Sequence, residues 1–352
     1  MKSHPEVDNH KLIYHPERVS EWIQKGDCYP IYVEIGPTNS CNHKCIFCAL
    51  DWLKKGVSNI DSEVLVRSLE EMAEVGVKSV MFAGEGEPLL HKEIGLFTKT
   101  AKQYGLDVSM TTNGVLFTQS KIEGCIPNLS WIRFSIDSGS AENYSLVHGT
   151  NSQDFERLIY NINESVKFRD KNKLDTIIGA QFLAISQNSD EAIKLTGILK
   201  KIGVDNLQIK PYSHHPSSAH DFTVTAEYYD QLEKKLEKFN SRDFKVLFRK
   251  KTIERLNSEA SYSQCYGLPF FALIDSRGDI FPCNLFYGKK EASYGNLYDK
   301  SFLDIWQGEK RKKILEKMNE KGVSDCRKGC RLDTINRYLD RLKNPSLHDN
   351  FI

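Results

Sequence analysis

Three cysteines stand close together in the segment Cys41-Asn-His-Lys-Cys45-Ile-Phe-Cys48. The chain has nine cysteines in 352 residues, and an odd number without an apolar signal segment argues against a disulfide framework. Three thiolates with no fourth nearby suit a [4Fe–4S] cluster that keeps one iron open, whereas structural zinc usually takes four ligands. An open iron is a place where a chelating small molecule can bind.

A second group, which we call the quartet, lies near the C-terminal end of the chain and consists of Cys265, Cys283, Cys326 and Cys330. Four soft thiolates suit either a second [4Fe–4S] cluster or a zinc ion. Separate thiols, each packed as a small hydrophobic side chain, are the remaining explanation. Cys28 and Cys125 stand apart from both groups, and we expect them to be inert.

The elements that hold these groups are predicted by the alternation of apolar and amphipathic segments. Strands are predicted over 31–36, 79–84, 107–113, 131–137, 175–185 and 206–212, and helices between them over 61–75, 93–105, 155–171 and 190–203. This alternation predicts an α/β fold with a parallel sheet made of right-handed βαβ units. Periodicity does not choose between a doubly wound sheet and a barrel, although six strands fit an open relative of the eight-fold barrel.

The alternation ends after a loop at 213–222 and a charged helix at 224–240. The following segment is rich in cysteine, glycine and aromatic residues and predicts a hairpin around Arg277-Gly278, with a last helix over 331–343. We therefore expect an N-terminal extension (1–30), an α/β region (31–250) and a small C-terminal domain (251–352).

The first cysteine group directly follows the first predicted strand, at the edge where α/β folds place their sites. The pattern CxxxCxxC, with Phe47 before the last cysteine, resembles the signature of the radical S-adenosylmethionine (SAM) superfamily. In that family, SAM chelates the open iron, and its reductive cleavage gives a 5′-deoxyadenosyl radical. The resemblance implies a partial (β/α)6 TIM-like barrel and makes Cys41, Cys45 and Cys48 the ligands of the catalytic cluster.

The ends of the next strands resemble the same family in order. Gly84-Glu85-Gly86-Glu87-Pro88 resembles the GGEP-like segment that binds the SAM amino group, although Glu85 between the glycines is a departure. Asn113 ends a segment similar to the family's TNG segment. Ser135 and Asp137 share one face of the fourth strand, with Arg133 deeper on that face. The resemblance implies contacts to SAM from Phe47, Gly84, Glu85, Gly86, Glu87, Asn113, Ser135, Asp137 and Gln181.

The quartet resembles the twitch or shortened SPASM extension found on many radical SAM enzymes. A full SPASM extension carries more cysteines and two auxiliary clusters, so four cysteines imply one auxiliary [4Fe–4S] cluster with all four as ligands. Such a cluster can accept an electron after hydrogen abstraction, bind the substrate or relay an electron. Zinc stays the alternative, and we expect Trp306 to be a core residue.

The substrate is expected inside the barrel, above SAM and below the C-terminal extension. Lys210 and Tyr212 share a face of the sixth strand, and His214 and His215 follow in the loop. These side chains suit phosphate, carboxylate or sugar hydroxyls, and a solvated loop is the alternative. Glu34 is a further candidate, unless it is an ordinary strand residue in a salt bridge.

We expect hydrogen abstraction from a small polar substrate, such as a sugar, an aminosugar or a nucleotide-linked sugar. Oxidation (dehydrogenation) and epimerisation both stay open, and a flavodoxin- or ferredoxin-type protein is the expected reductant. The alternative is a peptide-modifying enzyme, which we expect less because only about 30 residues precede the first strand, too few for a leader-binding domain. A non-catalytic iron–sulfur electron carrier is the remote alternative.

Charge and hydropathy fit this expectation. The chain has 48 Lys and Arg against 47 Asp and Glu, so its net charge of +1 gives no reason to expect a nucleic-acid or membrane partner. Its N-terminal segment is polar, and no apolar run approaches the roughly 18 residues of a membrane span. We expect a cytoplasmic enzyme.

Overall fold

The computed structural model describes residues 10–53, 56–188, 190–222 and 224–351. The strands in this part of the chain are β1 (Tyr32–Ile35), β2 (Ser79–Phe82), β3 (Asp107–Thr112), β4 (Trp131–Ser135), β5 (Ile177–Ala184), β6 (Asn206–Pro211), β7 (Lys245–Phe248), β8 (Phe271–Ile274), β9 (Asp279–Phe281) and β10 (Gly295–Asn296). The α-helices are α1 (Pro16–Lys25), α2 (Ser62–Glu74), α3 (Ile94–Gln103), α4 (Gln119–Cys125), α5 (Ala141–His148), α6 (Gln153–Lys171), α7 (Glu191–Ile202), α8 (Ala226–Glu237), α9 (Lys250–Leu256), α10 (Phe302–Gln307), α11 (Glu309–Lys321) and α12 (Asp333–Lys343).

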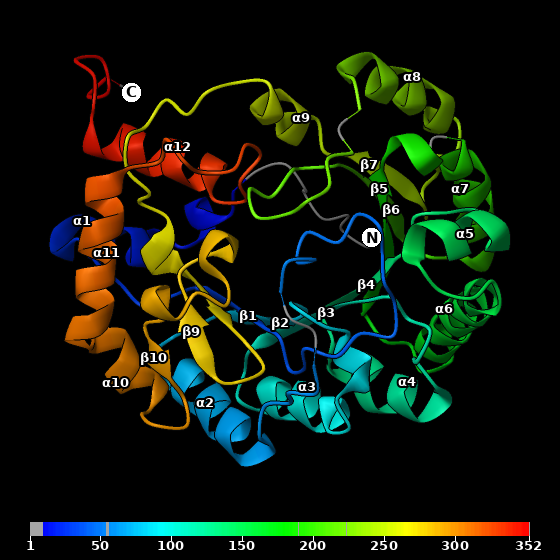
Figure 1. The fold of residues 1–352 in the computed structure, drawn as a ribbon, viewed down its shortest axis with the longest axis horizontal. Helices are drawn as coiled ribbons and strands as arrows, with labels where there is room; N and C mark the ends of the chain where they lie inside the picture. Colours follow the sequence, from blue (N-terminus) through cyan, green and yellow to red (C-terminus); the bar gives the residue numbers. More distant parts are fainter. Residues whose placement is uncertain (1–9, 54–55, 189, 223, 352) are drawn as a thin grey trace.

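All ten strands belong to one sheet, in the order β10-β9-β8-β1-β2-β3-β4-β5-β6-β7. Strands β1 to β7 pair in parallel, and β8 also runs parallel to its neighbour β1. Helices α2, α3, α4, α6, α7 and α8 lie around the outside of the curved sheet (Figure 1). The predicted α/β fold with a partial TIM-like barrel is therefore confirmed, and the doubly wound alternative, with helices on both faces, is not.

The two faces of the sheet differ in burial. On β4, Ile132 and Phe134 are fully buried beneath the outer helices, while Trp131, Arg133 and Ser135 alternate with them and keep accessible surface. The same register places Ser135 beside Gln181, and Gln181 beside Gln208. The outer face is thus the hydrophobic core, and the inner face carries the polar side chains that are available for chemistry.

Strands β7 and β8 extend the parallel part of the sheet beyond the six strands that were predicted. The short strand β7 pairs with β6, although its sequence Lys-Val-Leu-Phe gave little signal between two charged segments. Strand β8 comes from the C-terminal part of the chain and pairs with β1, with Tyr32 opposite Phe271. The predicted hairpin is β8–β9, and the predicted last helix is α12. The C-terminal part therefore continues the barrel sheet.

The N-terminal extension also packs on the C-terminal part. The guanidinium of Arg311, which is fully buried, donates two hydrogen bonds of 2.7 Å to the carboxylate of Asp27 and stacks over Trp306. Trp306 is a core residue, as expected, and its Nε1 donates to the carbonyl of Cys28. The division of the chain at residues 30 and 250 stays a prediction. No helix in the described ranges is long and apolar enough to cross a membrane.

Candidate active site

The first cysteine group lies in the loop that follows β1, at the carboxyl edge of the sheet. This cluster loop is fixed to the end of α5, because Lys44 and Ile46 donate backbone hydrogen bonds of 3.0 Å to the carbonyls of His148 and Val147. Gly149 ends α5 with a φ of +57°, and a Cβ there would lie 2.3 Å from the carbonyl oxygen of Lys44. Glycine is therefore required for the loop to approach the helix this closely.

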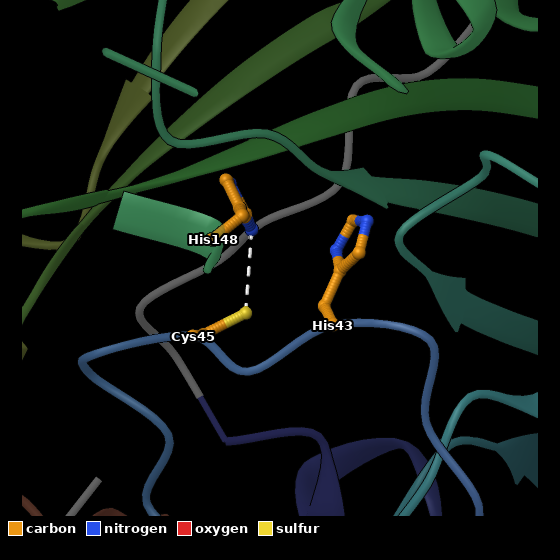
Figure 2. A group of neighbouring side chains, drawn as sticks. All are labelled: His43, Cys45 and His148. Carbon is orange, nitrogen blue, oxygen red and sulfur yellow. Dashed lines mark hydrogen bonds between the residues drawn. The ribbon is translucent and has the colours of Figure 1, made fainter. Parts of the chain in front are cut away.

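The sulfur of Cys45 lies between two imidazoles that the sequence analysis missed. Atoms of His43, Cys45 and His148 lie within 4.8 Å of one another, and Nδ1 of His148 is 3.3 Å from Sγ of Cys45 (Figure 2). The backbone N–H of Asp137 donates to Nε2 of His148 over 3.2 Å. Because Nε2 accepts this bond, we assign the ring proton to Nδ1, where it faces the sulfur; Nε2 also lies 3.5 Å from Oδ2 of Asp137.

The three cysteines lie close enough to Asp137 for their charges to influence the pKa of Cys45. The pKa of Cys45 is raised well above its usual value, first by burial and then by the negative charges of Asp137, Cys41 and Cys48. A thiolate at this position thus needs a cationic partner, which an iron–sulfur cluster would supply. The residues present therefore fit such a cluster, and the donor set of three sulfurs leaves one iron without a protein ligand.

The glycines of the segment after β2 bring it against the cluster loop. A Cβ on Gly86 would lie 2.4 Å from the carbonyl oxygens of both Thr38 and Ser40, and Gly84 has a φ of +102°. The backbone N–H of Glu87 donates to the carbonyl of Ser40 over 2.8 Å. These contacts leave no room for side chains, which is the close backbone approach that the family resemblance implies.

The carboxylates of this segment are engaged within the protein. Glu87 accepts hydrogen bonds from the hydroxyl of Thr112 and the backbone N–H of Asn113, so it joins the ends of β2 and β3. Glu85 accepts from the backbone and hydroxyl of Ser276, in the C-terminal part. The side chain of Asn113 donates to Asn42 in the cluster loop. Any contact of Glu85 to SAM is thus left to its backbone.

The polar residues at the ends of β4 and β5 face the inside of the barrel. Ser135 lies beside Gln181, and both keep accessible surface. Asp137 is buried and accepts a hydrogen bond of 2.5 Å from the backbone of Leu183. Burial raises the pKa of Asp137 to about 7, while the Leu183 hydrogen bond and the charge of Lys210 act in the opposite direction. The ring of Phe47 packs edge to face against the ring of His148, with the two ring centroids 5.4 Å apart.

The four cysteines of the quartet converge in the C-terminal part. Burial and the neighbouring thiolates Cys330, Cys283 and Cys326 all raise the pKa of Cys265. Asn336 donates to the sulfur of Cys265, and the backbone N–H of Leu332 donates to that of Cys330. Within the described residues no three of these sulfurs lie within 4.8 Å of one another. Four thiolates gathered in this way can serve as ligands of a metal centre.

Most of the predicted substrate residues are bonded to other groups of the protein, and one of them keeps a side chain that a ligand could reach. Glu34 forms an ion pair with Arg331, which immediately follows Cys330, and its role toward the substrate stays a prediction. Tyr212 and His214 both bond to the carbonyl of His220. His215 is fully buried and stacks on Trp52 of the cluster loop. Lys210 lies on the inner face of β6, opposite Leu183, and keeps accessible surface.

Comparison with known proteins bears on this geometry. The family model described as "Radical SAM superfamily" matches residues 35–180, and the model described as "Iron-sulfur cluster-binding domain" (SPASM) matches residues 265–331. This chain is a radical SAM enzyme with a C-terminal SPASM-like domain. The two domains imply SAM and two [4Fe–4S] clusters as cofactors, as expected.

Relatives of this radical SAM enzyme carry nucleotide names. It is 25% identical over 307 residues to the GTP 3′,8-cyclase of Clostridium perfringens, covering 82% of this chain and 90% of the relative. It is 34% identical over 110 residues to the S-adenosylmethionine-dependent nucleotide dehydratase of Lacinutrix mariniflava, covering 29% of this chain and 22% of the relative. The chain spans about half the length of several other curated relatives.

The fold of this radical SAM enzyme is similar to that of Streptococcus suis SuiB bound to S-adenosylmethionine. The TM-score is 0.66 with 19% identity, covering 95% of this chain and 79% of SuiB. SuiB has also been described bound to its precursor peptide SuiA. This similarity concerns the fold.

Proposed function

We propose that this radical SAM enzyme removes a hydrogen atom from a small polar substrate that enters the barrel between the two cysteine groups. The substrate is a sugar, an aminosugar or a nucleotide-linked sugar, and the outcome is oxidation or epimerisation. The cofactors, when bound, supply the radical that takes the hydrogen atom. The residues of the chain hold SAM and the substrate, exclude water and set the geometry of the transfer.

One observation carries this proposal: a row of available polar side chains crosses the inner face of the sheet. Ser135, Gln181 and Lys210 keep accessible surface, although each stands between buried neighbours on central strands. The row begins at Ser135, near Asp137 and the cluster loop, and it ends at Lys210. Lys210 interacts electrostatically with Asp137 and also with Arg327 of the quartet segment. A small molecule in contact with the row would lie between the two cysteine groups.

The names of the relatives favour the nucleotide-linked member of this substrate class. The Clostridium perfringens relative is named for GTP and the Lacinutrix mariniflava relative for a nucleotide. Neither name refers to a free sugar.

Oxidation is favoured over epimerisation by the two remaining thiols. An epimerising radical enzyme needs a hydrogen-atom donor on the far side of the substrate, and a cysteine commonly serves. Cys125, the last residue of α4, is fully buried, and Cys28 is buried where Trp306 and Arg311 hold the N-terminal extension. Neither has access to the inner face, so neither can deliver a hydrogen atom to a substrate bound there.

Each group of residues at the two cysteine groups and the strand ends has its own role. Cys41, Cys45 and Cys48 bind the catalytic cluster, and Cys265, Cys283, Cys326 and Cys330 bind the auxiliary cluster. SAM is held by the backbone of 84–87 and by Phe47, Asn113, Ser135, Asp137 and Gln181. A flavodoxin- or ferredoxin-type protein delivers the electron.

The test is a substrate screen with the reconstituted enzyme under anaerobic conditions. Candidate sugars, aminosugars and nucleotide-linked sugars are offered with SAM and dithionite, and 5′-deoxyadenosine is measured. The substrate should raise its formation, and deuterium at the reacting carbon should appear in 5′-deoxyadenosine. If only peptides stimulate SAM cleavage, the enzyme is a peptide-modifying one and the proposal fails.

A further inference from the structure

Four cationic side chains meet on the inner face of the barrel, beside the row of polar residues. Arg133 comes from β4 and Lys210 from β6. Arg249 follows β7, and its backbone N–H donates to the carbonyl of Ile209 over 3.2 Å, which places it next to Lys210. Arg327 reaches in from the quartet segment and donates hydrogen bonds of 2.5 and 2.7 Å to the carbonyl and hydroxyl of Ser213.

These cations influence one another strongly. Burial and the positive charges of Arg249, Arg327, Arg331 and Arg133 lower the pKa of Lys210 to about 7. Burial and Arg249 lower the pKa of Arg133 to about 9. Like charges in a medium of low dielectric constant repel one another, so holding them together destabilises the protein unless an anion joins them.

Negative charge acts on this group from Asp137, which is coupled to Lys210, and from Cys330 and Cys283, which are coupled to Arg327. In the ranges that the structure describes, no carboxylate lies within 4.0 Å of the charged groups of Arg133, Lys210 or Arg327. The carboxylate of Glu34, which is nearby, is already paired with Arg331. The carboxylate of SAM carries a single charge, so it cannot balance four cations.

A buried donor without a partner points to the same place. Gln208 is almost fully buried on β6, and its Oε1 accepts a hydrogen bond from Arg249. Its Nε2 has no hydrogen-bond partner among the described residues. A buried amide N–H that lacks an acceptor is costly, and a ligand oxygen would satisfy it.

We propose that Arg133, Lys210, Arg249 and Arg327 bind the phosphate groups of the substrate, which is therefore a phosphate or diphosphate ester of a small polar molecule. This inference rests on the proposed function, because it takes the inner face of the barrel to be where the substrate binds. The fork of a guanidinium matches two phosphate oxygens, and several guanidiniums with one ammonium suit a group of at least two negative charges. The Nε2 of Gln208 donates to the same anion.

The binding test uses inorganic pyrophosphate as the probe and isothermal titration calorimetry as the measurement, without reductant. The reconstituted wild-type enzyme should bind pyrophosphate, and Lys210→Gln and Arg133→Gln should each weaken binding at least tenfold. Lys210→Arg keeps the charge and should restore most of the affinity. The matched control is Lys167→Gln, which removes an exposed cation paired with Glu164 on α6 and should change nothing.

Equal pyrophosphate affinity in wild type, Lys210→Gln and Arg133→Gln would overturn the inference, as would an equal loss in Lys167→Gln. If Lys210→Gln fails to fold, Arg133→Gln decides. A second arm separates this inference from the proposed function. An uncharged sugar that drives SAM cleavage equally well in wild type and Lys210→Gln would leave the function standing and remove the phosphate site. If pyrophosphate binds through these residues but no small molecule drives SAM cleavage, the phosphate site stands and the proposed function fails.

Discussion

The imidazole of His148 joins the proposed cluster ligand Cys45 to the strand end that carries Asp137. Its Nδ1 lies 3.3 Å from the Cys45 sulfur (Figure 2). Its Nε2 accepts a hydrogen bond of 3.2 Å from the backbone N–H of Asp137. Burial and the neighbouring His43 lower the pKa of His148 well below its usual value, so the ring is neutral and donates a single proton. His148 therefore holds the cluster loop next to the end of β4.

Removing this donor should lower the reduction potential of the SAM-binding cluster. A hydrogen bond to a ligand sulfur stabilises the reduced, more negative cluster more than the oxidised one. His148→Leu should shift the potential downward by tens of millivolts, since 1 kcal/mol corresponds to roughly 40 mV for one electron. Electron paramagnetic resonance during a redox titration measures the shift.

The control variant is His148→Asn, whose amide nitrogen occupies nearly the position of Nδ1 and can still donate. It should keep a potential close to that of the wild type. Equal potentials in His148→Leu and the wild type would mean that the imidazole serves packing alone.

Iron content should separate the two cysteine groups. The reconstituted wild-type enzyme should hold about eight irons per chain, because each cubane carries four. Replacement of Cys41, Cys45 and Cys48 by alanine should leave about four. A wild-type content of about four irons would mean that the quartet binds no cubane, and a stoichiometric zinc content would identify its metal.

Loss of the auxiliary site should uncouple SAM cleavage from turnover. In the double variant Cys326→Ala, Cys330→Ala, the cluster loop and the SAM-binding edge are untouched, so slow formation of 5′-deoxyadenosine should persist. Product formation should fall steeply, and the melting temperature should drop because the C-terminal part loses a metal that links distant segments. Product formed at the wild-type rate would reduce the quartet to a structural role.

Substitutions at Ser135 and Asp137 should both weaken SAM binding but should differ in their effect on stability. Ser135→Ala removes a hydroxyl that faces the inside of the barrel, so it should weaken SAM binding with little change in melting temperature. Asp137→Ala should weaken SAM binding and also lower stability, because the backbone N–H of Leu183 loses its acceptor. Equilibrium dialysis with SAM and thermal unfolding measure the two effects. Unchanged SAM affinity in both variants would contradict the assignment.

Anion binding should depend on pH through Lys210. Its pKa is lowered to about 7, so the ammonium is present below that pH and is lost as the pH rises. Affinity for pyrophosphate should therefore decline above about pH 7 relative to Lys210→Arg, whose guanidinium stays charged. The comparison cancels the titration of pyrophosphate itself. The charged groups that face Lys210 are Arg133, Asp137, Arg249, Arg327 and Arg331.

The sequence predicted those parts of the fold that depend on local pattern. Six strands and the cluster loop were placed because apolar segments end at short, recognisable motifs. Strand β7 was missed because four residues between charged segments carry almost no periodicity, and its place is set by pairing with β6. The partnership of β8 with β1 joins segments more than two hundred residues apart and has no local signal.

The site was predictable where ligand spacing is local and was missed where the fold brings residues together. Cys41, Cys45 and Cys48 could be recognised from their spacing. His148 ends a helix that was not predicted, and only its position before Gly149 gave a weak signal for a helix end. Arg249 and Arg327 lie far from Lys210 in the sequence, in a loop after β7 and in the quartet segment, so their meeting depends on the curvature of the partial barrel.

The pairing of β8 with β1 sets an order of events during synthesis. Strand β1 leaves the ribosome among the first elements, yet one of its edges has no partner until residue 274 has been made. An open strand edge is a template for pairing with other chains, and contacts between distant segments form slowly. The cluster loop follows that same strand, so the growing chain presents its first three cysteines long before the sheet around them is complete. We therefore expect unfinished chains to associate through the open edge of β1 until the C-terminal part of the chain has been made.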